Sequence, residues 1–358
     1  MTYYRFEGWC GHGPESVKGQ MKWGEYEPKI WSEDDVDIRV SHCGICGSDL
    51  HTLRSGWGPT IYPCVVGHEI IGKAVRVGRN VKHVKTGDRV GAGAQASSCL
   101  KPDCAMCSDN FENHCVHMVN TYGSVYPDGK SKSYGGYADY NRTPGHFVFQ
   151  IPDEIKSKHA APILCGGITL YGPLKTYGAR GKRVGIVGLG GLGHFGVLFA
   201  KALGASEIVV ISRSHAKEED AKTLGADRFI ATADKGWDEG SNVSSLDLII
   251  STVSSDKMPL SGYLNLLNFR GTFVQVGAPE DPLPSFPAFA LISKAIHVTG
   301  SIIGSPKEIR EMLQLAKEKG IKPWTQEVLM KEANQAVVDF DAGKPRYRFV
   351  LKNENYIE

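Results

Sequence analysis

A glycine-rich turn at residues 188–193 constrains the fold of this chain more than any other feature. It reads Gly-Leu-Gly-Gly-Leu-Gly, follows an apolar strand-like run at residues 183–187 and precedes a helix-like stretch that ends near Leu203. In this context the pattern is typical of a dinucleotide-binding turn, although a tight strand–helix turn without a ligand would also use glycines. The glycines allow the turn, the approach of the backbone to a pyrophosphate and close helix–strand packing. We therefore predict pyrophosphate binding at the helix N-terminus by Gly188, Gly190, Gly191, Leu192 and Gly193.

The segment after this turn alternates between strand-like and helix-like stretches. A helix-like stretch lies near residues 216–224, and further apolar strand-like runs occur at residues 207–211, 246–250, 271–276 and 296–299. Such alternation predicts a doubly wound parallel sheet, that is, a Rossmann-type α/β domain.

The N-terminal part has a different rhythm. Short β-type runs separated by Gly, Pro and Asp occur at residues 37–41, 70–77, 89–92 and 137–141. No stretch with a helical period of useful length interrupts them, which indicates an irregular antiparallel barrel.

The C-terminal part contains one clear helix. Ser305, Pro306 and Glu308 form an N-cap, a first-turn proline and a capping-box acid, and Gly320 ends the helix. A last β-like run follows at residues 347–351.

The length of 358 residues predicts two domains. We expect the barrel domain at residues 1–157, the nucleotide-binding domain at residues 158–300, and a return to the barrel domain at residues 301–358.

Charge and hydropathy restrict the partners. The net charge is +2 without a dense basic block, so binding to nucleic acid or to an anionic membrane is not expected. The N-terminus has no apolar stretch of signal-peptide length, and the most apolar run, residues 184–200, is too short to span a membrane. The sequence predicts a cytoplasmic protein that acts on small molecules.

The residues after the second strand of the nucleotide-binding domain predict the choice of cofactor. An acidic residue there would bind the adenosine ribose of NAD. This chain instead has Ser212, Arg213 and Ser214, with Lys217 one turn later. Hydroxyl groups and cations suit a 2′-phosphate, which favours NADP, although a solvated basic turn is the alternative.

Four of the nine cysteines lie close together in one short segment, as Cys99, Cys104, Cys107 and Cys115. Four thiolates can complete a tetrahedral zinc site without an open position, and such a site is structural. A disulfide or redox role is the alternative, but disulfides are rare in a reducing compartment. A zinc knuckle that binds nucleic acid or protein is a different alternative, and the near-zero net charge and the absence of interleaved basic and aromatic residues around this loop argue against it.

A second, dispersed group also contains possible metal ligands. The segments are Cys-Gly-Ile-Cys-Gly-Ser-Asp-Leu-His at residues 43–51, Gly-His-Glu at residues 67–69, and Cys-Gly-Gly at residues 165–167. One imidazole and two thiolates would leave a position open on zinc, the arrangement that makes zinc a Lewis acid. Taken singly, each of these residues is more often structural.

Together these segments, in this order and spacing, resemble the zinc-dependent medium-chain alcohol dehydrogenases. Within that family the resemblance is to the cinnamyl alcohol dehydrogenase group and its fungal NADP-dependent relatives. It extends over nearly the whole chain and includes Leu-Cys-Gly-Gly-Ile-Thr at residues 164–169 and Arg-Tyr-Arg at residues 346–348. The family implies a GroES-like barrel domain, NADP(H), two zinc ions per chain and a homodimer. One departure is the spacing from Cys99 to Cys104, with four intervening residues where the family usually has two.

The resemblance also implies roles for individual residues. Cys46, His68 and Cys165 would bind the catalytic zinc with Glu69 as an alternating ligand, and Cys43 would not bind it. Asp49 would orient His68, and Ser48 and His51 would relay a proton. The further cofactor contacts that we expect are Thr169, Val276, Ser301, Ile303 and Arg348.

The predicted reaction interconverts an aldehyde and a primary alcohol. Trp57 and Ile302, together with Ile303, are candidates for an apolar wall that fits aromatic (cinnamyl-type) or medium-chain aliphatic substrates, although Trp57 could equally serve ordinary packing. An NAD-linked polyol dehydrogenase, of the mannitol or sorbitol type, is the alternative.

Overall fold

The computed structural model describes residues 4–356, and the chain divides into two compact units. The first unit contains the residues up to Cys165 and those from Gly304 onward. The second unit is Gly166–Ile303 and is inserted between the two parts of the first. The predicted boundaries, after residues 157 and 300, lie a few residues earlier in the chain.

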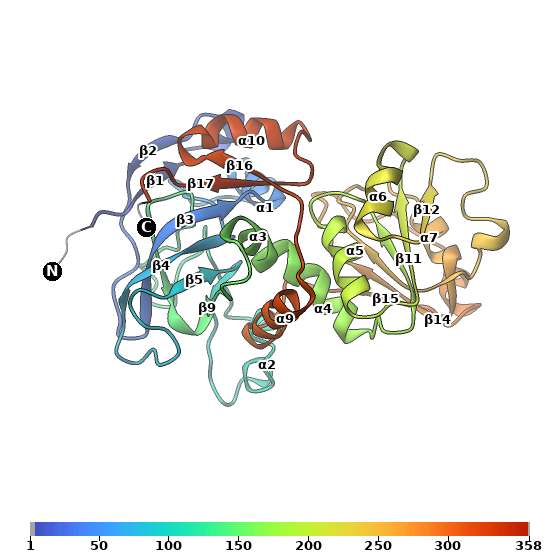
Figure 1. Cartoon of the computed structure of the whole chain (residues 1–358), viewed down its shortest axis with the longest axis horizontal. Coiled ribbons are helices and arrows are strands. Elements are labelled where there is room, and N and C mark those ends of the chain that lie inside the picture. Colours follow the sequence, from blue (N-terminus) through green and yellow to red (C-terminus); the bar gives the residue numbers. More distant parts are fainter. Residues whose placement is uncertain (1–3, 357–358) are drawn as a thin grey trace. The chain divides into compact units, whose positions relative to one another are not determined.

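The second unit is built on a six-stranded parallel sheet (Figure 1). Its strand order is β12-β11-β10-β13-β14-β15, which is that of a doubly wound sheet, the fold predicted from the sequence. All neighbouring pairs are parallel. The strands are β10 (Arg183–Val187), β11 (Glu207–Ser212), β12 (Arg228–Ala231), β13 (Leu246–Ser251), β14 (Leu267–Gln275) and β15 (His297–Gly300).

The helices of the second unit follow the strands, as expected for a doubly wound sheet. The helix after the glycine turn is α5, and the helix predicted near residues 216–224 is a short 3-10 turn, η5, followed by α6. The helical elements are α4 (Ile168–Thr176), α5 (Gly193–Ala202), η5 (His215–Lys217), α6 (Glu218–Leu224), η6 (Gly240–Asn242), α7 (Leu260–Leu266) and α8 (Phe289–Ile292).

The first unit contains a seven-stranded sheet in which the two ends of the chain meet. Strand β17, red in Figure 1, pairs antiparallel with blue β3, which also pairs with β4 and β8. The order is β16-β17-β3-β4-β5-β9, and only β16 and β17 are parallel neighbours in it. The strands are β3 (Asp35–Gly44), β4 (Ile70–Val77), β5 (Arg89–Ala92), β8 (Tyr140–Pro144), β9 (Val148–Gln150), β16 (Thr325–Leu329) and β17 (Arg348–Lys352).

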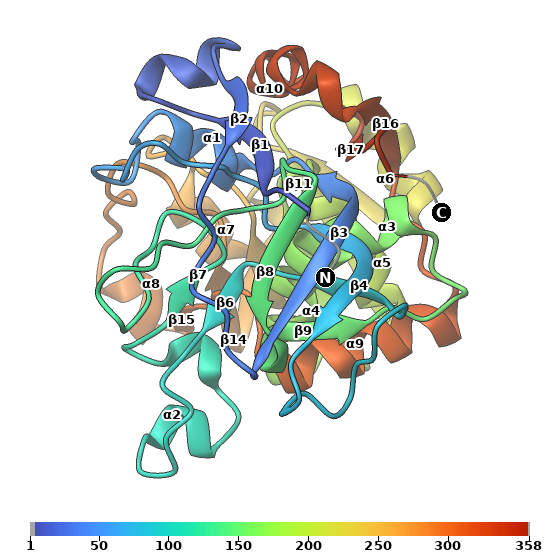
Figure 2. The same ribbon diagram turned by 90° about the vertical axis from the view of Figure 1, so that its left-hand side faces the viewer.

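Two small antiparallel sheets complete the β structure of the first unit. They pair β1 (Glu7–Cys10) with β2 (Lys22–Glu25), and β6 (Gln95–Ser97) with β7 (Val119–Asn120). Figure 2 shows β3, β4 and β8 side by side, and the loop that carries α2 extends away from them.

We predicted that no helical stretch of useful length interrupts residues 30–150, and this prediction is wrong at α1 (Gly47–Leu53). This helix has only seven residues, too few for a helical period to stand out, and it depends on capping by Asp49 and on the buried Leu50 and Leu53. The other helical elements of this unit are η1 (Pro14–Lys18), α2 (Ala105–Ser108), η2 (Glu112–His114), η3 (Gly145–Phe147), α3 (Ser157–Pro162), α9 (Pro306–Lys319), η7 (Met330–Glu332) and α10 (Ala333–Asp341). A short π-helix, η4 (Ile163–Gly167), continues from α3.

The predicted C-terminal helix is α9, and its capping box is confirmed. The Ser305 hydroxyl accepts a hydrogen bond from the Glu308 amide at 3.3 Å, and the Glu308 carboxylate accepts one from the Ser305 amide at 2.9 Å. Gly320 ends the helix with a φ of 62°, in the left-handed region that glycine adopts without strain. Among residues 4–356, no helix has both the length and the apolarity needed to cross a bilayer.

Candidate active site

Four possible metal ligands from three distant segments meet in the first unit. Cys46 is the N-cap of α1, His68 and Glu69 immediately precede β4, and Cys165 lies in the short π-helix η4 after α3. One ligand atom from each of the four side chains lies within 4.8 Å of the others. The Cys46 and Cys165 sulfurs are 3.8 Å apart, and the His68 Nε2 atom is 3.0 Å from the Cys165 sulfur.

The pairing of β3 with β4 brings this group together. The amide of Gly44, the last residue of β3, donates a hydrogen bond to the Glu69 carbonyl at 3.0 Å, so Cys46 and Glu69 leave the sheet at the same end. A Cβ atom on Gly44 would lie 1.8 Å from the Glu69 Oε2 atom. A glycine is therefore required for the Glu69 carboxylate to occupy this position.

Burial changes the acid–base properties of the four side chains, which are all buried. Burial raises the pKa of Glu69 to about 7, against the opposing charge of Arg348. For His68, burial alone would lower the pKa, but the Cys46 thiolate outweighs it, and the pKa rises to about 9. The contact between the sulfurs lowers the pKa of Cys46 and raises that of Cys165. Burial thus favours the neutral forms of Glu69 and Cys165, whereas their neighbours favour the ionised forms of Cys46 and His68.

This donor set fits zinc. Two sulfurs, an imidazole nitrogen and a carboxylate oxygen are typical zinc ligands. The Glu69 Oε2 atom is buried and has no hydrogen-bond partner among the described residues, an arrangement that costs free energy unless a cation is bound. The residues that we predicted for the catalytic metal are thus brought together.

Groups around the ligands hold them in place. Asp49 accepts hydrogen bonds from the Cys46 amide at 2.8 Å, the Gly67 amide at 3.1 Å and the Tyr137 hydroxyl at 3.0 Å. Its carboxylate is 3.7 Å from the His68 Nδ1 atom, whereas the Tyr122 hydroxyl is nearer, at 3.0 Å. The sequence predicts a role for Asp49, whereas no local motif marks either tyrosine.

Arg348 is also part of this surrounding layer. It is 2% exposed and forms an ion pair with the Glu69 carboxylate. We expected Arg348 to contact the cofactor, and that contact stays a prediction. Its observed partner is Glu69, and this contact depends on the pairing of β17 with β3, which no local motif predicts.

The two residues predicted to relay a proton lie three positions apart on α1. The Ser48 hydroxyl is 3.6 Å from the Cys46 sulfur. The His51 ring stacks on the Trp57 ring, with 4.4 Å between centroids and 15° between planes, and its Nδ1 atom is 3.3 Å from an Arg54 nitrogen. Trp57 is 49% exposed, so an apolar ring surface remains available beside the relay.

The glycine turn has the geometry that its sequence predicts. It follows β10 at its carboxyl end, and Gly188 has a φ of 87°. A Cβ on Gly193 would lie 1.8 Å from the Gly188 carbonyl oxygen, so any larger residue would force the turn apart. The Lys217 ammonium donates a hydrogen bond to the Leu189 carbonyl at 2.7 Å, which places this predicted phosphate contact beside the turn.

The remaining residues predicted for the cofactor are distributed over the same unit. Ser212 ends β11, and Arg213 and Ser214 follow it in exposed positions. Thr169 is buried in α4. Val276 and Ser301 follow β14 and β15 directly, and their amides donate to the Ser251 and Gln275 carbonyls. Ile302, half exposed, and Ile303, with a φ of 39°, come next. Most of this set thus lies at the carboxyl ends of the parallel strands, where open α/β sheets bind their ligands.

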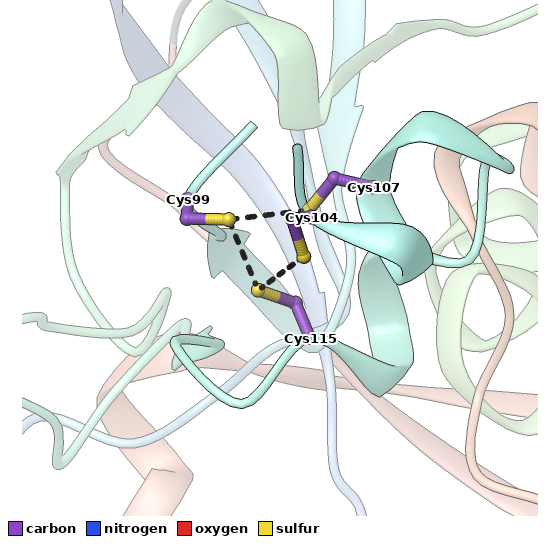
Figure 3. Close-up of side chains that lie close together, drawn as sticks. All are labelled: Cys99, Cys104, Cys107 and Cys115. Carbon is purple, nitrogen blue, oxygen red and sulfur yellow. Dashed lines mark hydrogen bonds between the residues drawn. The ribbon is translucent and has the colours of Figure 1, made fainter. Parts of the chain in front are cut away.

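The four clustered cysteines form a second group of possible ligands (Figure 3). The Cys99 sulfur is 3.6 Å from that of Cys107 and 3.5 Å from that of Cys115, and the Cys104 and Cys115 sulfurs are 4.0 Å apart. Leu100 has a φ of 49°, and the Cys104 amide donates to the Lys101 carbonyl at 3.1 Å. The long spacing after Cys99 is therefore absorbed by a turn, and the four sulfurs still converge as a closed zinc site requires.

Comparisons with known proteins agree with this arrangement. Residues 32–153 match the family described as alcohol dehydrogenase GroES-like domain, and residues 191–318 match the family described as zinc-binding dehydrogenase. Cinnamyl alcohol dehydrogenase 2 of Rauvolfia serpentina is 41% identical, over 98% of this chain and 96% of the relative. The chain belongs to the zinc-dependent medium-chain alcohol dehydrogenases.

Two further relatives of this alcohol dehydrogenase differ in their named activities. NADP-dependent alcohol dehydrogenase 6 of Saccharomyces cerevisiae is 42% identical, over 97% of this chain and 96% of the relative. A probable mannitol dehydrogenase of Fragaria ananassa is also 42% identical, over 98% and 96%.

Solved structures confirm the predicted combination of a GroES-like domain and a Rossmann domain in this alcohol dehydrogenase. A cinnamyl alcohol dehydrogenase from Sorghum bicolor has a TM-score of 0.91 and 36% identity, covering 98% of each chain. A second structure, described as CAD from Helicobacter pylori complexed with NADP(H), has a TM-score of 0.88 and 31% identity, covering 99% of this chain and 100% of that one.

Proposed function

We propose that this alcohol dehydrogenase uses NADP(H) and interconverts primary alcohols with cinnamyl-type aromatic or medium-chain aliphatic aldehydes. The observation that carries the proposal is the buried group of Cys46, His68, Glu69 and Cys165, with the Ser48 hydroxyl next to it. A zinc ion held there supplies Lewis acidity toward a carbonyl oxygen, and a reduced dinucleotide supplies the hydride.

The residues around the metal ligands determine the rest of the reaction. Tyr122 and Asp49 fix the orientation of the His68 ring through its Nδ1 side. In the direction of reduction, the Ser48 hydroxyl donates the proton that the product oxygen needs. His51 lies one turn later on the same helix, partly exposed, where an imidazole can exchange protons with water near neutral pH.

NADP is favoured because the turn after β11 offers hydroxyl and cationic groups and no carboxylate at positions 212–214. The named NADP dependence of the yeast relative and the NADP(H) complex of the bacterial structure support the same choice. The apolar face of Trp57 beside His51 supports an aromatic substrate.

The activity is tested by the initial rate of NADPH or NADH oxidation with cinnamaldehyde. We expect clear preference for NADPH, no turnover in Cys46→Ser or His68→Ala, and a reduced but measurable rate in His51→Ala. Full activity in the His68→Ala variant would refute the metal site. The relatives named mannitol dehydrogenases give the second candidate function, which NAD-linked oxidation of mannitol without reduction of cinnamaldehyde would establish instead.

A homodimer formed through the second unit is part of the proposal. Strand β15 is an edge strand of the six-stranded sheet, and Val298 on it is 40% exposed. Phe269, Phe289 and Ile292 of the same unit are more than 60% exposed, and apolar patches of this kind are typical of protein interfaces. Light scattering should give twice the chain mass, and Val298→Arg should give the monomer mass; a monomeric wild type would contradict the dimer.

The cytoplasm is the proposed location. All nine cysteines are free thiols in the structure, and two groups of them converge without forming disulfides. Such thiols persist as metal ligands in a reducing compartment. Recovery of the protein in the soluble cytoplasmic fraction of the cell is expected, and recovery outside the cell would contradict this location.

A further inference from the structure

The turn proposed to bind the 2′-phosphate lies among acidic residues. Glu218, Glu219 and Asp220 form the first turn of α6. Asp234 lies beside the turn from the other side, because the preceding residue, Ala233, donates its amide hydrogen to the Arg213 carbonyl at 3.0 Å. A 2′-phosphate carries a charge of about −1.5 to −2 at neutral pH, so these carboxylates would oppose its binding.

His215 contacts two of these acids at once. Its Nδ1 atom is 2.7 Å from the Glu218 carboxylate, and its Nε2 atom is 3.0 Å from that of Asp234. With a carboxylate at each ring nitrogen, the imidazole is held as a cation that donates two hydrogen bonds. These contacts, with that to Glu218 the larger, raise the pKa of His215 above its ordinary value.

Other groups face His215 as well. Glu218 also pairs with Lys222 at 3.2 Å, the Phe229 ring of β12 lies 5.9 Å from the imidazole, and Lys217 completes the same 3-10 turn. Lys222 shares Glu218 with His215, whereas Asp234 forms its ion pair with His215 in the part of the chain that the structure describes. The position of His215, immediately after Ser214, places its charge at the end of the turn.

We propose that His215 is a positioning residue for cofactor specificity, which neutralises Glu218 and Asp234 so that the turn at residues 212–214 accepts a dinucleotide with a 2′-phosphate. The inference rests on the proposed use of NADP. NADH lacks the phosphate, so the charge state of His215 should matter little for NADH binding. His215 acts through the two acids and need not touch the cofactor.

The test compares His215→Gln with His215→Lys in the full-length enzyme. Removing one positive charge near a dianion should raise KM for NADPH by about 3- to 10-fold at low ionic strength, with kcat and KM for NADH unchanged. His215→Lys keeps the charge and should retain the wild-type KM. His215 and Asp234 are more than half exposed, so the difference should shrink in high salt.

Two controls separate charge from structure. Lys201→Gln removes a positive charge from the last turn of α5 and should leave both KM values unchanged. Asp234→Asn combined with His215→Gln should restore part of the lost affinity for NADPH, because one of the exposed carboxylates is gone. If the double variant is no better than His215→Gln, neutralisation of Asp234 is not the mechanism and the inference fails.

The pH profile gives an independent readout. The raised pKa means that His215 is charged below it and loses its charge as pH rises through it. The 2′-phosphate is already almost fully ionised above about pH 7. The wild-type KM for NADPH should therefore rise as the pH increases through the raised pKa of His215, and that of His215→Lys should not.

The outcomes distinguish this inference from the proposed function. Preference of the wild type for NADH would overturn the proposed cofactor and the inference with it. Preference for NADPH with an equal KM in His215→Gln, or with equal losses for both cofactors, would overturn the role of His215 alone.

Discussion

At the scale of single residues, the buried ion pair between Glu69 and Arg348 shows how one side chain supports a metal ligand. Both side chains are buried, and one Glu69 oxygen faces Arg348 while the other has no hydrogen-bond partner in the described chain. The positive charge of Arg348 therefore opposes the effect of burial and favours the ionised form of the Glu69 carboxylate next to two sulfurs. Glu69 can then serve as a metal ligand while Arg348 compensates part of the negative charge of the site.

Replacing Arg348 by Met should destabilise the first unit by about 3–5 kcal/mol, because breaking a buried pair leaves one charge unpaired. The free energy of unfolding from urea titration measures the effect. Arg346→Met is the matched control, since Arg346 is exposed, and it should change the stability by less than about 1 kcal/mol. Equal stability of the wild type and Arg348→Met would show that the pair contributes nothing.

The sequence predicted the ligands better than the residues that hold them. Cys46, His68, Glu69 and Cys165 stand in short motifs whose spacing is informative. Tyr122 follows β7 and contacts His68, and Tyr137 precedes β8 and contacts Asp49. No neighbouring residue in the sequence indicates either hydrogen bond. Contacts of this kind depend on how distant segments pack, so a single sequence does not reveal them.

At the scale of elements, helix α9 shows that local capping is readable from sequence. Ser305→Ala removes the acceptor for the Glu308 amide and should cost about 1 kcal/mol of stability. The midpoint of chemical denaturation measures this loss. Lys307→Ala is the control, because Lys307 is exposed and lies two residues after Ser305, and it should change the midpoint little. An equal loss in both variants would contradict the capping role.

The cysteine loop is an element whose stability we expect to depend on a bound metal. Its two helical turns, α2 and η2, have three or four residues each and bury few side chains, so we expect a bound zinc ion to supply much of their stability. Cys107→Ser should lower the melting temperature while the purified enzyme keeps activity at low temperature; a loss of about 3 kcal/mol corresponds to roughly 6–12 °C in a unit of this size. An unchanged melting temperature would contradict a structural metal.

Strands with strong patterns were predicted closely, and weakly patterned elements were missed. The runs at residues 70–77, 89–92 and 183–187 coincide with β4, β5 and β10. Strand β12 has four residues, and α1 and α7 have seven each, so their periodicity is too short to separate from the background. Strand β16 is largely exposed and pairs with β17, so its conformation is set by its neighbour rather than by an apolar pattern.

At the scale of the whole molecule, the insertion of one unit into the other distributes the candidate sites over two units. The first unit contains both groups of possible zinc ligands, and the second contains the glycine turn and the residues after β11. The change of rhythm near residue 180 predicted this division, because parallel and antiparallel sheets have different sequence patterns. The positions of the boundaries, at Cys165 and Ile303, depend on packing.

The measurement that tests the central claim most directly is the zinc content of the purified chain, together with its activity. We predict two zinc ions per chain in the wild type, one in Cys46→Ser with no turnover, and one in Cys107→Ser with turnover retained at low temperature. A wild type without zinc, or Cys46→Ser with one zinc and full NADPH-dependent reduction of cinnamaldehyde, would contradict the account.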